Sequence, residues 1–400
     1  MNHASPGRKS LALAFVFCAR AMGVVLLVFS SFVSSFGASS IIGLGPYFRA
    51  DAVSADGKVV VGNRDGEIWR WTAASGRTEC IGKSPDYRVV EVNGVSADGS
   101  VVVGQLFGRL SKARREVTAD GHVIIYEPAN EAFRWTAAGG FVTLGHFRKD
   151  HPSSSARAVS GDGSVVVGLS SSDKPGGAFR WTAAGGMVNL GVPPGGYDSS
   201  YAFGVSSDGS TVVGRINSSS DCQAFRWSSA SGMVCLGKLP SKKTADGSVE
   251  ARSLSRTRGS CAYGITADGS VVVGLSENQA CSWKADGSMV KLGRLRGSRS
   301  CVATAVSDDG SVIVGLATLP NSWLSFLFPD DVSPPIVPFI WDSVNGMRGP
   351  KSVLTKDYHL DLSGWKLTCI TGIPADGKTI VGAGEHNGHA EAWIAHLDRR

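Results

Sequence analysis

The chain has 400 residues, of which 51 are glycine, 42% are hydrophobic and only 18% are charged. This composition argues against a helical protein and favours many tight turns between strands that are buried on both faces. The formal net charge of +6 favours an anionic partner only slightly, because solubility alone can explain such a charge.

The first 38 residues differ in kind from the rest. A basic pair, Arg8-Lys9, precedes two apolar runs, and small residues gather just before residue 40. This pattern is typical of a bacterial-type secretory signal, with cleavage expected near residues 35–38. Arg20 interrupts the apolar region, so a later start at Met22 and an uncleaved membrane anchor remain alternatives. We predict a signal peptide at 1–38, a domain at 39–400, an extracytoplasmic location (secreted, periplasm or envelope) and no membrane span after cleavage.

After residue 40 one phrase recurs seven times. In its clearest copy, at 158–191, AVSGDGSVVVG is followed by AFRW and then by GGMVNLG. The average spacing of the copies is roughly 53 residues, a period typical of bladed repeat folds. Each copy is centred on one Asp-Gly pair, and the aspartates are Asp56, Asp98, Asp162, Asp208, Asp268, Asp309 and Asp376.

One copy predicts four antiparallel strands. The Asp-Gly pair lies between β-branched runs and predicts a short hairpin, because glycine accepts a positive φ without a Cβ clash. The run 165–167 is all valine, which predicts a strand covered on both faces. Phe179 and Trp181 lie on one face of the third strand, and Gly185-Gly186 turns into the fourth. Such a sheet is stable only when copies of itself stack on both faces.

The two ends of the repeat region complement each other. The last copy ends after its third strand, whereas residues 40–45 form a fourth strand without the first three. We predict that they pair, because closure of the ring removes exposed sheet edges. The predicted fold is therefore all-β: a single seven-bladed β-propeller of four-stranded antiparallel blades, closed by the N-terminal strand. A further Asp120-Gly121 pair leaves an eighth, damaged unit as an alternative, and no amphipathic helix is expected after residue 40.

The copies differ mainly in their loops. The short hairpin turns fall on one face of the predicted propeller, while the loops from strand two to strand three and between blades fall on the other, the long-loop face. Binding sites gather on such variable loops. Three large inserts, 105–130, 238–260 and 316–338, lie there, and the last is apolar and rich in proline. Basic side chains gather in these loops, and we predict the following ligand-binding set: Arg109, Lys112, Arg114, Arg115, Lys242, Lys243, Arg252, Arg256, Arg258, Arg294, Arg296 and Arg299.

Other motifs are weaker. The Asp-Gly turns lack the further oxygen ligands of a calcium loop and the aromatic residue of a sialidase box, so they indicate turn structure. His386, His389 and Glu391 resemble a loose metal trio without a third nitrogen ligand. Asp150-His151 near Ser153–Ser155 resembles a hydrolase triad only by adjacency in sequence. We predict no catalytic residue, no cofactor and no metal site.

Arginines and cysteines have structural interpretations. The residues before the blade tryptophans, Arg70, Arg134, Arg180 and Arg226, are expected to form ion pairs with a turn aspartate of the same or the next blade, with surface exposure as the alternative. Seven cysteines follow residue 38, and none has the CxxC spacing of a zinc site. They are expected to be small buried apolar side chains, and one or two disulfides are the alternative.

The repeated VSxDGSVVVG, xAFRW and MVxLG phrases resemble the HAF-repeat family of extracellular bacterial proteins. The closing LDLSGW, GIPADGKTIVG and EAWI phrases also resemble the usual end of such chains. The resemblance covers nearly everything after residue 41 and implies export and a propeller-like fold. It implies no settled activity and no catalytic residues. The chain departs from the family in that no copy contains His-Ala-Phe itself.

These observations predict an exported, non-catalytic interaction or scaffold protein, expected to be a monomer. Its ligand would be an anionic polysaccharide, an envelope component such as a lipid headgroup, or an acidic protein, bound on the long-loop face. A carbohydrate-active hydrolase or lyase at the mouth of the central channel is the alternative, although the loop carboxylates Asp150, Asp198, Asp330, Asp331 and Asp357 show no paired spacing. A structural envelope protein is a third interpretation. Nucleic acid is not expected, because of export and because the basic residues are not interleaved with stacking aromatics.

Overall fold

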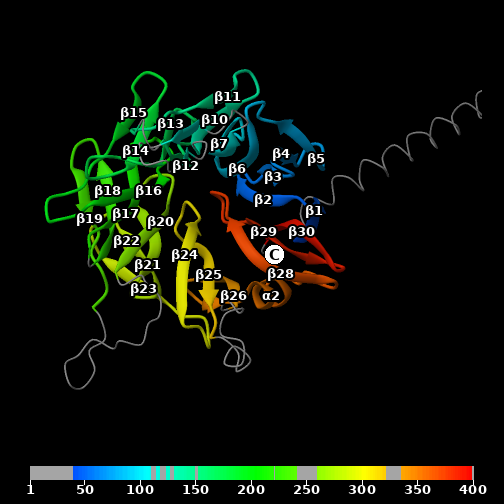
Figure 1. Cartoon of the computed structure of the whole chain (residues 1–400). Helices are drawn as coiled ribbons and strands as arrows, with labels where there is room; N and C mark the ends of the chain where they lie inside the picture. The colour runs from blue at the N-terminus through cyan, green and yellow to red at the C-terminus, as the bar shows by residue number, and fades with distance from the viewer. Residues whose placement is uncertain are drawn as a thin grey trace, which may run out of the picture.

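The computed structural model describes residues 39–109, 114–117, 123–126, 130–148, 152–219, 221–240, 259–320 and 335–398. Within these ranges, seven four-stranded antiparallel sheets stand around a common axis as the blades of a propeller (Figure 1). The predicted fold class and blade count are confirmed. In the same ranges, no helix is both long and apolar enough to cross a membrane.

Six blades are each built from one segment of the chain, and the chain enters each blade at its innermost strand and leaves it at the outermost one. The first three blades are β2 (Arg49–Val53), β3 (Val59–Arg64), β4 (Glu67–Thr72) and β5 (Arg77–Gly82); β6 (Tyr87–Val95), β7 (Val101–Arg109), β10 (Glu131–Thr136) and β11 (Gly140–Thr143); and β12 (Ser154–Val159), β13 (Val165–Ser170), β14 (Ala178–Thr182) and β15 (Gly186–Asn189). The next three are β16 (Ser199–Val205), β17 (Thr211–Asn217), β18 (Cys222–Ser228) and β19 (Gly232–Cys235); β20 (Ser260–Ile265), β21 (Val271–Ser276), β22 (Gln279–Lys284) and β23 (Met289–Gly293); and β24 (Ser300–Val306), β25 (Val312–Thr318), β26 (Ile336–Asp342) and β27 (Gly346–Arg348).

The seventh blade joins the two ends of the chain. Its inner strands are β28 (Trp365–Gly372), β29 (Thr379–His386) and β30 (His389–His396), and its outer strand is β1 (Ser40–Pro46). Ile42 pairs with Ile394 and Gly43 with Trp393 in antiparallel register. The predicted closure by the N-terminal strand is therefore confirmed, and the first and last strands lie side by side in Figure 1.

The hydrophobic core lies between neighbouring blades. Val166 and Phe179 of the third blade pack with Val103 and Ala132 of the second, and all four are fully buried. The all-valine strands are covered on both faces, as predicted. Each blade thus hides its faces against two neighbours, which explains why the strands can lack hydrophobic alternation.

Each Asp-Gly turn is held by its own side chains. In the third blade, the Ser160 hydroxyl donates to Asp162 Oδ1 at 2.6 Å, and the Ser164 amide donates to the same oxygen at 2.9 Å. These bonds, that of Ser160 first, lower the pKa of Asp162 to about 2. Gly163 follows with φ +72°. The carboxylate is satisfied within the turn, which confirms the structural interpretation.

The seven turns are linked into a closed circle of hydrogen bonds. The residue before each turn aspartate donates its amide to the next blade, as in Ala97 to Gly161 O (3.0 Å) and Gly161 to Ser207 O (2.8 Å). At one junction the acceptor is a side chain, because the Ala267 amide donates to Asp308 Oδ1 at 3.1 Å. Ala375 donates to Ala55 O at 3.1 Å and completes the circle.

Every innermost strand carries a β-bulge, and the bulge explains the glycine that ends the VVVG phrase. In the third blade the register shifts between Ala156 and Ala158. The bulged strand brings the Ser155 carbonyl against Gly168 of the second strand, and the Phe179 ring lies on the same spot. A Cβ on Gly168 would collide with the carbonyl and lie 2.9 Å from the ring. In the other six blades, a Cβ on the equivalent glycine would collide with the corresponding carbonyl of the innermost strand. These glycines are Gly62, Gly104, Gly214, Gly274, Gly315 and Gly382.

Two of the arginines before the blade tryptophans reach the next blade, but not its aspartate. Arg134 Nε donates to Gly163 O at 3.1 Å, and Arg180 Nε donates to Gly209 O at 3.4 Å. The predicted ion pair with a turn aspartate is wrong, because that carboxylate is already filled by its own turn. Arg70 instead pairs with Glu79 in its own blade, at 2.6 Å.

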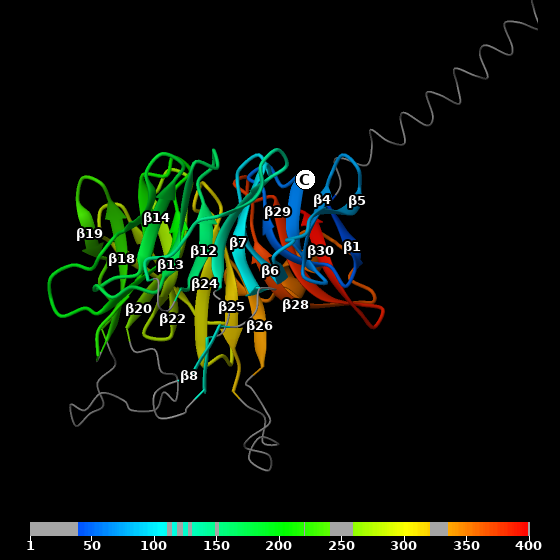
Figure 2. The same ribbon diagram turned by 45° about the horizontal axis from the view of Figure 1, so that its top comes forward.

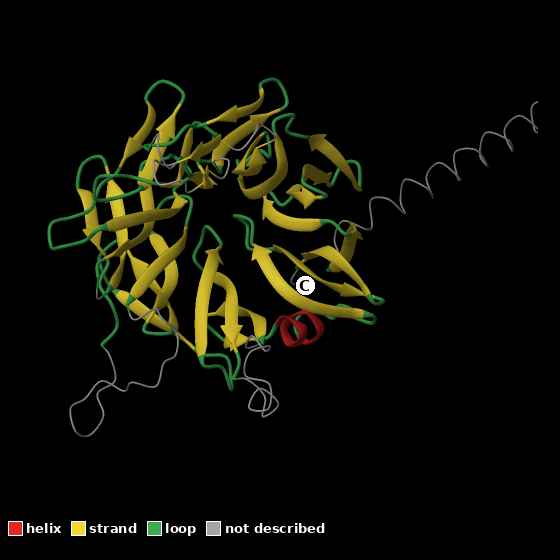
Figure 3. Cartoon of the chain, viewed as in Figure 1, coloured by secondary structure: helices red, strands yellow, loops and turns green. Residues whose placement is uncertain are grey.

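Two further features lie outside the four-stranded blades. The insert of the second blade contains β8 (Arg114–Val117) and β9 (Val123–Tyr126), which form a separate two-stranded sheet, so the phrase at Asp120 is not part of an eighth blade. A seven-residue helix, α2 (Pro350–Lys356), precedes the last blade (Figure 3). The expectation of no helix was wrong here, because a helix this short buries only Pro350, Val353 and Leu354 and leaves no periodic signal.

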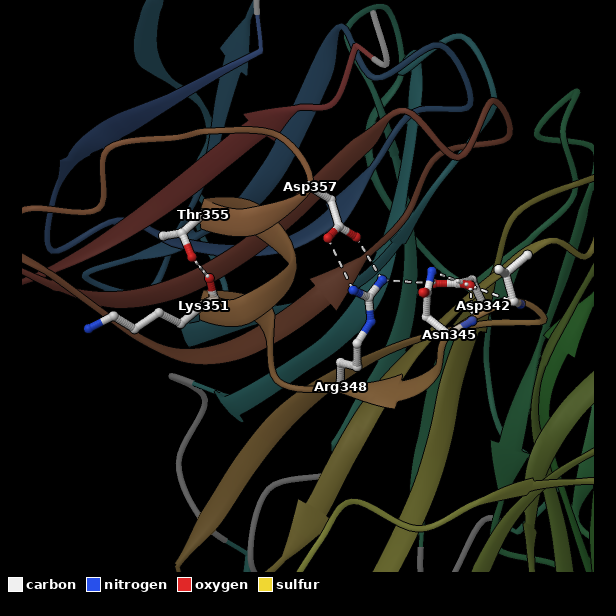
Figure 4. Close-up of polar contacts among 7 residues, drawn as sticks. Asp342, Asn345, Arg348, Lys351, Thr355 and Asp357 are labelled. Atoms are coloured by element: carbon white, nitrogen blue, oxygen red, sulfur yellow. Dashed lines mark hydrogen bonds and ion pairs between the residues drawn. The ribbon is translucent and has the colours of Figure 1, made fainter.

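A guanidinium fastens α2 to the sixth blade (Figure 4). Arg348 donates to both oxygens of Asp357, at 3.1 and 2.7 Å, and to Asp342 Oδ2 at 3.0 Å. Burial alone would raise the pKa of Asp342, but hydrogen bonds from Asn345 and Arg348 outweigh burial and lower it. The ion pairs connect the end of β26, β27 and the C-terminal end of α2, so they fix the chain as it enters the closing blade.

We predict that Gly168→Ala lowers the free energy of unfolding by about 3 kcal/mol, because neither the backbone carbonyl nor the buried ring can move aside. Gly349→Ala is the matched control, since Gly349 has φ −70° and no atom within 4 Å of its added Cβ. Urea titration measures both variants. Equal stability of the two would contradict the bulge explanation.

Candidate functional site in the central channel and on the long-loop face

A cavity of about 310 Å³ lies on the propeller axis. It is lined by three consecutive residues from each of the seven innermost strands. The third of these residues is Val or Ile in every blade and the second is Gly or Ala, as in Gly264-Ile265. The second residue is small because the next strand lies close: a Cβ on Gly264 would lie 2.9 Å from Thr304 O.

The first of the three residues is the bulged one, and it differs from blade to blade. A bulge turns an extra side chain away from the regular pleat. We call the seven bulged residues the bulge ring, which in order around the channel consists of Asp51, Asn93, Arg157, Phe203, Tyr263, Thr304 and Thr371. Because each inner strand runs from the long-loop face to its Asp-Gly turn, the ring lies nearer the long-loop end of the channel than the circle of hydrogen bonds does.

One arc of the bulge ring is polar. Asn93 Nδ2 donates to Ala156 O at 2.8 Å, which leaves its amide oxygen without a partner among the described residues. Arg157 Nε is buried and has no hydrogen-bond partner, and none of the described carboxylates pairs with this guanidinium. The terminal nitrogens of this guanidinium have no described partner either, so Arg157 keeps N–H donors for an acceptor in the cavity.

The opposite arc is aromatic and hydroxylic. The Phe203 and Tyr263 rings stack with centroids 5.3 Å apart and planes inclined by 30°. Thr304 Oγ1 donates to Val314 O at 3.4 Å, and Thr371 Oγ1 donates to Val381 O at 3.3 Å. Each hydroxyl oxygen keeps lone pairs with which it can accept a hydrogen bond.

Asp51 is the unusual titratable group of the ring. Only 4% of its side chain is exposed, and its Oδ2 is buried without a partner, although Oδ1 lies 2.6 Å from Arg49 Nε. Burial raises the pKa of Asp51 to about 7, against the effect of Arg49 and with a smaller contribution from Glu91. The carboxyl therefore changes charge near neutral pH.

The basic ligand-binding set is only partly described. Arg294, Arg296 and Arg299 lie exposed in the loop between β23 and β24. Arg109 ends β7, and Arg114 and Arg115 begin β8, but their side chains lie outside the described part. Lys112, Lys242, Lys243, Arg252, Arg256 and Arg258 also lie outside it. Arg109 ends a strand of the second blade, whereas the loop of Arg294, Arg296 and Arg299 joins the fifth blade to the sixth, across the ring from it (Figure 1).

The weaker motifs have structural explanations. His386 belongs to β29 and not to a loop: it stacks on Trp365 at 4.1 Å, and its Nδ1 lies 3.0 Å from Glu391 Oε2. Glu391 Oε1 accepts the Gly45 amide, so the pair supports the closing strand. Among the described residues, no group of three His, Cys, Asp or Glu side chains could hold a metal ion. Asp150-His151 lies outside the described residues.

The cysteines of the described chain are all free thiols. Cys261, Cys281 and Cys301 are buried, and Cys281 takes the place that Phe179 has in the third blade. Burial raises the pKa of Cys261 to about 12, so its thiol stays protonated. These three agree with the prediction of small buried apolar side chains, whereas Cys80 is exposed.

Sequence analysis missed the bulge ring. Its members share no residue type, and a bulge has no signature in a strand of five to nine residues. A usable signal was present: the residue five before each turn aspartate varies through Asp, Asn, Arg, Phe, Tyr and Thr, although the residues after it hardly change. Variation at one fixed place in a repeat marks a side chain that packing does not determine.

No family model and no curated protein matches this chain. Similar solved structures include TolB from Acinetobacter baumannii, with 14% identity, TM-score 0.37 and coverage of 62% of this chain and 53% of that one. A putative TolB from Agrobacterium tumefaciens has 12% identity, TM-score 0.38 and coverage of 90% and 99%. An oligogalacturonate lyase in complex with manganese has 12% identity, TM-score 0.34 and coverage of 86% and 75%. At these scores the likenesses carry no information on ligand or activity.

We predict that Asp51 makes the protein less stable as the pH rises from 4 towards 7. The folded state holds the proton more tightly than the unfolded chain does, so this group costs about 1.4 kcal/mol per pH unit in that interval. Urea titration gives the free energy of unfolding at pH 5 and at pH 8. Between these two pH values it should fall by about 3 kcal/mol less in Asp51→Asn than in the wild type. Asp198→Asn, at an exposed site, is the control. A loss equal to that of the wild type would show that Asp51 is not the titrating group.

Proposed function

We propose that this protein is an exported, non-catalytic binding propeller of the HAF-repeat type, and that it holds an anionic polysaccharide on its long-loop face. The observation that carries the proposal is the loop between β23 and β24. It presents Arg294, Arg296 and Arg299 to solvent within six positions, and no described residue pairs with their side chains.

Unpaired arginines at such spacing produce a positive local field. Some exposed lysines elsewhere have a carboxylate partner: Lys83 Nζ lies 3.0 Å from Glu67 and Lys366 Nζ lies 3.3 Å from Glu385. Arginine also binds carboxylate and sulfate groups through a planar fork of donors. The loop is therefore better suited to an external anion than to an internal salt bridge.

The backbone of the segment that carries Arg109, Arg114 and Arg115 lies on the same face. β7 ends at Arg109, and the hairpin that begins at Arg114 continues beyond that end, on the side of the ring away from the Asp-Gly turns (Figure 2). Because the two groups lie across the channel from each other, a long ligand fits them better than a small one. A polysaccharide that lies over the channel mouth would contact both.

Export is supported by the pattern of residues 1–38 and by the resemblance of the repeats to the HAF family. The enzyme alternative has less support. Asp51 is the one carboxyl of the bulge ring, so the ring lacks the pair of carboxyl groups that most glycosidases use. Asp357 is occupied by Arg348, at 2.7 Å.

Replacement of Arg294, Arg296 and Arg299 by Gln should weaken binding to alginate, a carboxylated polysaccharide, at least tenfold at low salt. Charge screening should weaken wild-type binding as salt is added. The matched control replaces Lys58, Arg77 and Lys378 by Gln, because these exposed residues remove the same charge from the short-turn face. Surface plasmon resonance measures both, with neutral dextran as reference.

The result that contradicts the proposal is equal loss of affinity in the two triple variants, or alginate binding that is indifferent to both variants and to salt. If anionic lipid vesicles or an acidic protein bind more strongly than alginate, the ligand of this face belongs to that class and the polysaccharide proposal is wrong.

A further inference from the structure

We infer that the bulge ring is a binding site for one acidic sugar residue, with its carboxylate on Arg157, its hydroxyls on Asn93, Thr304 and Thr371, and its ring against Phe203 and Tyr263. The inference deepens the proposed function, because an acidic sugar is the repeating unit of an anionic polysaccharide. It rests on other residues, however, and can be tested separately.

The guanidinium of Arg157 fixes the charge of the ligand. It lines the cavity, its Nε is buried without a partner, and the described residues provide no carboxylate for it. Its terminal nitrogens carry N–H donors that no described acceptor fills, so an acceptor that enters the cavity is the partner left for them. A carboxylate matches the planar fork of arginine and would fill two donors at once.

The remaining polar groups of the ring offer acceptors. Asn93 has committed its amide nitrogen to Ala156 O, and Thr304 and Thr371 have committed their hydroxyl hydrogens to backbone carbonyls. Each of these cavity-lining residues therefore keeps an oxygen that can accept a hydrogen bond. A ligand that satisfies them must bring hydrogen-bond donors of its own. A polyhydroxylated acid does this, whereas a simple aromatic acid does not.

The aromatic arc gives the ligand a flat support. Phe203 and Tyr263 stack on each other and line the same cavity, next to Arg157 in the order of the ring. The negative face of an aromatic ring attracts the weakly positive C–H groups of an apolar surface, such as one face of a sugar. The cavity of about 310 Å³ lies at the lower end of the volumes of small-molecule sites, which suits one sugar residue and not an oligomer.

Isothermal titration calorimetry with D-glucuronate, D-glucose and benzoate tests the inference on the protein purified after export. We expect glucuronate to bind at least tenfold more tightly than glucose or benzoate. Arg157→Met should lower the affinity for glucuronate at least tenfold and leave the affinity for glucose unchanged. Arg157→Lys should keep part of the glucuronate affinity that Arg157→Met loses. Phe203→Leu should weaken both sugars. Thermal unfolding of each variant verifies that the fold is retained.

Three results would overturn the inference: no glucuronate binding by the wild type, unchanged glucuronate affinity in folded Arg157→Met, or benzoate binding as tightly as glucuronate. The triple Gln variant of Arg294, Arg296 and Arg299 separates the two proposals. Glucuronate affinity should be the same in this variant as in the wild type. Alginate binding without glucuronate binding would reject the channel site alone, and the converse would reject the long-loop proposal alone.

Discussion

The fold depends on a circle of hydrogen bonds that no single blade can make. In each turn the residue before the aspartate donates its amide to the next blade, and the circle closes where Ala375 reaches Ala55. Each bond contributes only about 1 kcal/mol on its own. Together they fix the rotation from blade to blade, and the closure succeeds only if all seven blades are present and the last one is complete. β1 completes it from the other end of the chain.

The same geometry separates the repeated residues from the variable ones. The turn serines and aspartates hold the hairpins, the VVVG glycines admit the bulged strand of the same blade, and buried aromatics such as Phe179 pack between blades. The bulge makes this separation possible, because it brings a backbone carbonyl against a glycine such as Gly168 and frees one side chain per blade from the core. Seven freed side chains then meet on the axis. A repeat that stacks identical units thus creates one place where the units can differ without loss of stability.

Much of the fold was predictable because its determinants are local. Asp162-Gly163 specifies a hairpin, Val165–Val167 specifies a strand covered on both faces, and the fragments at 40–45 and 389–396 complement each other. Contacts between distant segments were harder. The partner of Arg180 was assigned to a carboxylate on grounds of charge, yet the turn had already satisfied that carboxylate and left the Gly209 carbonyl as acceptor. The site was less predictable still, since a bulge has no residue preference. The long basic loops, which were predicted from charge alone, lie largely outside the described chain.

The central claim is that pairing of the N-terminal strand β1 with the last blade holds the ring of seven blades closed. Hydrogen exchange tests this claim most directly. Amide exchange is compared by mass spectrometry between a chain that begins at Ser39 and one that begins at Tyr47. The account predicts that loss of β1 exposes the amides of residues 389–396, and that exchange also quickens at the turn residues of every blade, because the circle of hydrogen bonds opens. If the shortened chain keeps the protection of Ala55, Gly161 and Ala375, the blades hold together without closure and the claim is wrong.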